Sequence, residues 1–142
     1  MSSYSYHLVE TCAKLKVILK KDVLKYQDQK QGVYELSDDV HGKPSWTSSS
    51  MAIWYIPVSK VWGIGPLESI GSSIVGIFGP NNVLDYPHEI KQWNYVIDEN
   101  TIETATETDV IIKCMDSDGM DSEGMNSIFF FLKKCIKFIF EI

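Results

Sequence analysis

Residues 51–64 read MAIWYIPVSKVWGI, which is two apolar runs on either side of the turn-forming tetrapeptide PVSK. Both runs are rich in β-branched and aromatic residues, which suit a pleated, half-buried surface. Proline and serine favour the turn between them. Comparable runs occur at 14–19, 32–36, 73–78, 93–97 and 109–114. Strand-like runs separated by turns predict an all-β fold, as a small single-domain antiparallel sheet or a compact sandwich or barrel.

The run at 14–19 shows the alternation most clearly. Leu15, Val17 and Leu19 occupy every second position, which is typical of a strand with one buried face. Before residue 115, the apolar residues form no helical stripe longer than one turn. The one helical turn that we expect in this part of the chain lies around residues 88–92.

Composition divides the chain into four parts. These are an N-terminal extension at 1–11, a β-rich module at 12–114, a flexible acidic linker at 115–127 and an apolar, basic tail at 128–142. The linker reads MDSDGMDSEGMNS, which offers little with which to build a core. In the tail, Lys133, Lys134 and Lys137 fall on one side of a helical wheel, so we expect a short amphipathic helix.

The charge of the chain argues against a nucleic-acid partner. The net charge is −6, and all 13 basic residues are lysines. A nucleic-acid binder normally shows a basic patch. The lack of arginine also removes the usual bidentate clamp for phosphate or guanine.

Two of the three cysteines, Cys12 and Cys114, stand at the ends of the β-rich module. Each flanks a strand-like run, and the ends of a domain often lie close together. We therefore predict a Cys12–Cys114 disulfide, which leaves Cys135 unpaired. The alternative is two buried free thiols in an intracellular protein. The predicted disulfide favours an extracellular location, although residues 1–9 show no secretory signal.

The tryptophans suggest either a core or a binding surface. Trp46, Trp54 and Trp62 are spaced eight residues apart, an interval that matches successive strands and turns. A small core that uses large aromatic residues is the favoured interpretation. The alternative is an exposed platform for glycans or protein partners. Its candidate ligand-binding residues are Trp46 and Tyr55, since both lie near polar, turn-rich sequence.

No motif for a cofactor or a metal is found. The glycines at 63, 65 and 71 do not make a dinucleotide fingerprint, because Glu68 occupies the position of the third glycine. We expect these glycines in turns or bulges. His7, His41 and His88 lack the spacing of a ligand pair, and no Cys-x-x-Cys occurs. We predict neither a cofactor nor a metal.

Two stretches carry a resemblance to other proteins: QGVYELSDDVHGKPSW at 31–46 and MAIWYIPVSKVWGIGPLESIG at 51–71. They resemble a recurrent tryptophan- and glycine-containing, cysteine-flanked module of uncharacterised invertebrate proteins. The resemblance covers roughly residues 12–114. It implies an extracellular, often repeated, disulfide-linked β-rich domain, and it carries over no named activity and no catalytic residue.

The favoured function is a non-enzymatic binding or structural module that recognises glycans or protein partners through aromatic residues. A second hypothesis is a small domain held at a membrane surface by residues 128–142, because a basic stripe and apolar bulk suit an interfacial helix. An enzyme with a dispersed site is the least favoured, since no nucleophile motif or activating cluster is visible.

Overall fold

The structure is a computed structural model that describes residues 11–81 and 86–115. These residues form nine strands, one short α-helix and three single-turn 3-10 helices. In chain order they are β1 (Lys14–Leu19), α1 (Lys21–Gln27), η2 (Asp28–Lys30), β2 (Gly32–Val40), β3 (Lys43–Thr47), β4 (Met51–Ile56), β5 (Val61–Pro66), η3 (Leu67–Ser69), β6 (Ile77–Phe78), η4 (Pro87–Glu89), β7 (Asn94–Asp98), β8 (Thr101–Thr104) and β9 (Val110–Met115).

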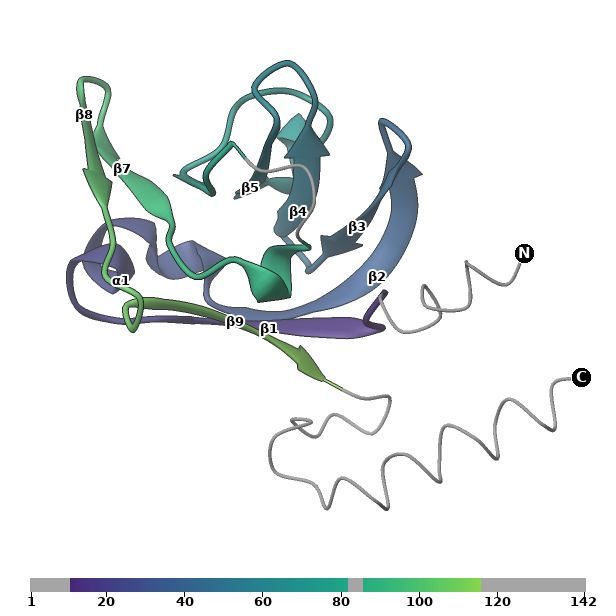
Figure 1. The fold of residues 1–142 in the computed structure, drawn as a ribbon, viewed down its shortest axis with the longest axis horizontal. Coiled ribbons are helices and arrows are strands. Elements are labelled where there is room, and N and C mark those ends of the chain that lie inside the picture. The colour runs from purple at the N-terminus through teal and green to yellow at the C-terminus, as the bar shows by residue number, and fades with distance from the viewer. Residues whose placement is uncertain (1–10, 82–85, 116–142) are drawn as a thin grey trace, which may run out of the picture.

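All nine strands belong to one sheet, in the order β8-β7-β6-β5-β4-β3-β2-β1-β9. Every neighbouring pair is antiparallel. Each strand from β1 to β7 pairs with the next one along the chain, and β9 then returns to pair with β1, so β8 and β9 are the two edge strands. Figure 1 shows the sheet curling, with β1 and β9 along the base of the view and the β7–β8 hairpin standing at its left. The predicted all-β antiparallel fold is confirmed, as a single curled sheet.

The main core lies on the inner face of this sheet. In β1, Leu15, Val17 and Leu19 are at most 2% exposed, and the residues that alternate with them are only partly buried. Cross-strand pairing extends the same face, since Leu15 lies opposite Tyr34 of β2 and Val17 lies opposite Ile112 of β9. The period of two in the sequence therefore identified the buried face of this strand correctly.

The four tryptophans are part of the core. Each is at most 1% exposed. The ring centroid of Trp62 lies 6.0 Å from that of Trp46 and 5.4 Å from that of Tyr55. Tilted and edge-on contacts of this kind stabilise a core beyond the area that they bury. The favoured interpretation of the tryptophans as core residues is confirmed.

A second, smaller cluster lies on the outer face of β4. Every residue of β4 is buried, because a segment after η3 crosses over the strand. Val75 and Ile70 of that segment pack against the cluster that contains Trp54. The indole nitrogen of Trp54 donates to the main-chain carbonyl of Ser72 at 2.8 Å. Strand β4 is therefore covered on both faces.

Two glycines of β5 allow this segment to approach the sheet. A Cβ at Gly63 would lie 2.6 Å from a methyl carbon of Val75, and one at Gly65 would lie 2.5 Å from the carbonyl oxygen of Ile74. Both glycines lie inside a paired strand, so their expected place in a turn or bulge was wrong. Gly71, with a φ of +94°, does lie in a turn.

Helix α1 is an element that the sequence pattern did not predict. Val23 and Gln27 are its buried residues, one turn apart. The amide nitrogen of Gln27 donates to the main-chain carbonyl of Val96 in β7 at 2.6 Å. The helix therefore packs against β7 through one apolar and one polar side chain. The helical turn expected around residues 88–92 is present as η4, shifted toward the N-terminus.

The predicted acidic linker lies outside the described residues, except for Met115, and so does the whole of the tail at 128–142. The N-terminal extension is described only at Thr11. Among residues 11–81 and 86–115, no helix is long and apolar enough to cross a membrane.

Candidate functional site

The disulfide between Cys12 and Cys114 is the most distinctive chemical feature of the structure. Cys12 precedes β1, and Cys114 lies in β9 opposite Leu15. The two Cα atoms are 5.7 Å apart, although 102 positions separate the residues in sequence. The structure thus contains the cysteine pair that the sequence predicted, and the bond joins the segment just before the first strand to the last strand.

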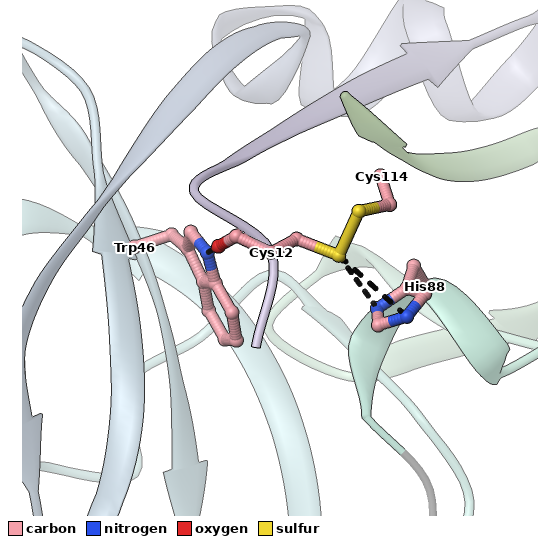
Figure 2. Close-up of a disulfide and its surroundings, with 4 residues drawn as sticks. All are labelled: Cys12, Trp46, His88 and Cys114. Carbon is pink, nitrogen blue, oxygen red and sulfur yellow. Dashed lines mark hydrogen bonds between the residues drawn. A yellow bond between two sulfur atoms is a disulfide. The ribbon is translucent and has the colours of Figure 1, made fainter. Parts of the chain in front are cut away.

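Trp46 lies beside this disulfide. Its indole nitrogen donates to the main-chain carbonyl of Cys12 at 2.8 Å, as Figure 2 shows. The side chain of Cys12 is only 6% exposed. A buried carbonyl without a donor would be costly. Trp46 therefore satisfies the main chain at the point where the disulfide closes the module.

His88 of η4 lies on the other side of the bond (Figure 2). Its two ring nitrogens are 3.7 and 3.9 Å from the sulfur of Cys12. Tyr86 stacks on the imidazole with ring centroids 6.2 Å apart and planes at 15°. Burial lowers the pKa of His88, and the nearby Glu89 carboxylate opposes that shift. The neutral imidazole is thus the favoured form beside the sulfur.

The chemistry available at this corner is limited while the bond is intact. A bonded sulfur is a weak hydrogen-bond acceptor and cannot act as a nucleophile, which requires a thiolate. The contact of His88 with the sulfur is long for a hydrogen bond of any strength. Because the side chain of Cys12 is also buried, these features assign the disulfide a structural role. Sequence reasoning did not find His88 as its neighbour, because 76 positions separate it from Cys12.

The two candidate ligand-binding residues are not exposed. Trp46 is fully buried, and Tyr55 is 5% exposed. Tyr55 packs edge-on against Trp62, and the Nζ of Lys43 lies 5.2 Å from its ring centroid. The expectation that one of these rings faces solvent was wrong, because the curl of the sheet turns both into the main core.

Only one aromatic ring in the described part of the chain is well exposed. This is Tyr26 of α1, at 41% exposure, and the Nζ of Lys25 lies 5.2 Å from its centroid. One ring in a polar neighbourhood is common on protein surfaces. The described surface therefore lacks the row of coplanar aromatic rings on which a platform for glycans would depend.

Other polar groups have structural roles or are isolated from one another. A ring nitrogen of His41, at the tip of the β2–β3 hairpin, lies 2.8 Å from the carbonyl oxygen of Gly71. Lys30 is 9% exposed. Burial lowers its pKa, and the negative charge of Asp28 acts in the opposite direction to a smaller extent. Asp109 is 8% exposed, and its Oδ1 has no hydrogen-bond partner.

The part of the chain that the structure describes brings together no group of three histidine, cysteine, aspartate or glutamate residues that could hold a metal ion. No family model, curated protein or solved structure matches this chain. The functional interpretation therefore depends on the geometry of the described residues.

Proposed function

We propose that residues 12–114 form a non-enzymatic module that works in an oxidising, extracellular environment and binds a protein partner. The observation that carries this proposal is the Cys12–Cys114 disulfide, which cross-links the start of the module to β9, the last strand in the chain. Disulfides persist outside the reducing cytosol, and small secreted domains use them because their cores are modest.

The burial of the aromatic residues favours a protein partner over a glycan. Stacking on a sugar requires an exposed ring, and Trp46, Trp54, Trp62 and Trp93 are all in the core. Recognition would then depend on the polar surface and on the main chain. The histidines also favour a non-enzymatic module, since His88 contacts a bonded sulfur and His41 contacts a main-chain carbonyl.

The test is the redox state of the cysteines in protein secreted from cells. Denatured material is alkylated without reduction, digested and analysed by mass spectrometry, with a parallel sample that is reduced first. We expect a Cys12–Cys114 cross-linked peptide that disappears on reduction, and alkylation of Cys135 in both samples. A Cys135→Ala variant controls for exchange with the third cysteine. Full alkylation of Cys12 and Cys114 in the unreduced sample would overturn the proposal.

A further inference from the structure

The two edge strands of the sheet are held differently. At one edge, η4 packs against β9 and the disulfide holds β9 to the start of β1. At the other edge, β8 pairs with β7 alone. Figure 1 shows the β7–β8 hairpin standing away from the strands at the base of the view. The edge strand β9 is therefore tied to the rest of the fold by a helix contact and a cross-link, whereas the edge strand β8 is held by its pairing with β7.

The backbone of β8 presents hydrogen-bonding groups on its open side. Ala105, just after the strand, donates from its amide to the carbonyl of Trp93 at 2.8 Å. Glu103 lies opposite Tyr95. The main-chain groups of successive residues point to opposite sides of an antiparallel strand. Those of Glu103 and Ala105 face β7, so the amides and carbonyls of Ile102 and Thr104 point away from it. Ile102 is also 59% exposed, so an incoming strand could reach it.

Proteins usually protect such an edge with charged side chains, lysine above all, with proline, with a short strand or with a covering segment. The sequence of β8 is TIET, which carries the acidic Glu103 but neither lysine nor proline. Its short length limits any pairing to a few residues. The open edge is therefore suited to one short extended segment rather than to a long strand.

The charge of this region specifies the partner. Residues 92–112 contain five acidic residues and no lysine. Asp98, Glu99, Glu103 and Glu107 are all exposed. The pKa of Tyr95 is raised by burial and, to a smaller extent, by Asp22 and Glu103. A second copy of the chain would bring like charges together, which is unfavourable for directly opposite residues. A basic segment would instead be attracted.

We propose that β8 binds a short extended segment with lysine or arginine at alternate positions, by adding it to the sheet as a further strand. The basic side chains of this segment lie on the face of Glu103, and its β-branched side chains lie on the face of Ile102. Main-chain hydrogen bonds supply affinity in this mode, and alternate side chains supply specificity. The inference specifies the partner class of the binding module proposed above and depends on that proposal.

The test uses the full chain and a synthetic peptide, acetyl-TKVKVKT-amide, with affinity measured by titration in amide-detected NMR. We expect saturable binding, with the largest shifts at Ile102 and Thr104 and slower hydrogen exchange of their amides. Replacing the three lysines of the peptide by glutamate should weaken binding by at least about tenfold, because the attraction becomes repulsion. N-methylation of alternate peptide amides should abolish binding, since it removes the donors and adds bulk.

A matched pair of protein variants isolates the edge. Ile102→Pro removes an outward amide that no strand of the sheet uses, so the fold is retained. We expect it to lose at least about tenfold in affinity, whereas Ile102→Val binds as the unmodified chain does. Circular dichroism checks the fold of both variants. The N-methylated peptide tests the same edge hydrogen bonds on the unmodified chain.

Three results would overturn this inference: no saturable binding up to about 1 mM peptide, equal binding of the lysine and glutamate peptides, or unchanged binding by Ile102→Pro. Concentration-dependent self-association that Ile102→Pro removes would instead identify a second copy as the occupant and would also overturn it. None of these results depends on the redox state of Cys12 and Cys114, so failure here is distinguishable from failure of the proposed location.

Discussion

Removal of the Cys12–Cys114 disulfide should cost much of the stability of the module. The bond joins residues 102 positions apart. In the chain-entropy model, a loop of this length corresponds to about 4.7 kcal/mol at 25 °C. The hydrogen bond from Trp46 is made to the main chain of Cys12, so it is retained when both cysteines become alanine. The loss should therefore come mainly from the greater freedom of the unfolded chain.

The assay is urea unfolding of Cys12→Ala/Cys114→Ala, followed by the fluorescence of the buried tryptophans. We expect the free energy of unfolding to fall by about 3–5 kcal/mol, and the midpoint of thermal unfolding to fall by about 15–35 °C. The m value should rise, because an unfolded chain without the cross-link exposes more surface. Cys135→Ala is the control and should leave both quantities unchanged. A loss below about 1 kcal/mol with an unchanged m value would refute the reasoning.

Three further predictions follow from the packing and from the histidine beside the disulfide. Gly65→Ala should cost about 1–3 kcal/mol in urea unfolding, because the new methyl group meets the carbonyl of Ile74; unchanged stability would contradict this close approach. Trp46→Ala should cost about 3–5 kcal/mol in the same assay, and a cost under 1 kcal/mol would contradict its place in the core. Because burial lowers the pKa of His88 below 6.5, the unfolded chain binds a proton more readily than the folded one. Stability should thus fall as the pH drops below about 6.5, and urea unfolding between pH 7 and pH 5 should show a smaller fall in His88→Gln; an equal reduction in His41→Gln would contradict the assignment to His88.

The sequence was informative wherever one face of a strand is buried. The alternation at Leu15, Val17 and Leu19 predicted the inner face of β1, and the structure buries those residues. Residues 51–56 read MAIWYI without alternation, and all six are buried. An uninterrupted apolar run of this length is the mark of a strand covered on both faces. We expected a half-buried surface for this run, so the covering on the outer face of β4 was missed, although the lack of alternation is consistent with it.

The elements that were missed have short or polar sequences. Strands β3 and β8 carry few apolar residues, and each exists because its neighbours in the sheet supply its hydrogen bonds. Helix α1 has seven residues, too few for a repeating apolar stripe. Its buried face includes Gln27, whose amide finds a partner in β7 only after folding. Elements of this kind depend on contacts between distant parts of the chain, so local patterns do not show them.

The tryptophans illustrate why the candidate binding residues could not be separated from core residues in the sequence. Three indole nitrogens donate to main-chain carbonyls of segments that lie outside the strands. They are those of Trp46, Trp54 and Trp93, which bond to Cys12, Ser72 and Ile90. Trp46 of β3 and Trp54 of β4 thus each join an irregular segment to the sheet, through apolar contact over the ring and one hydrogen bond at the nitrogen, whereas Trp93 bonds within its own segment before β7. Polar, turn-rich sequence near a tryptophan was taken to indicate exposure. In this fold, the turn-rich segments themselves supply the carbonyls that a buried indole needs, so the same pattern accompanies burial.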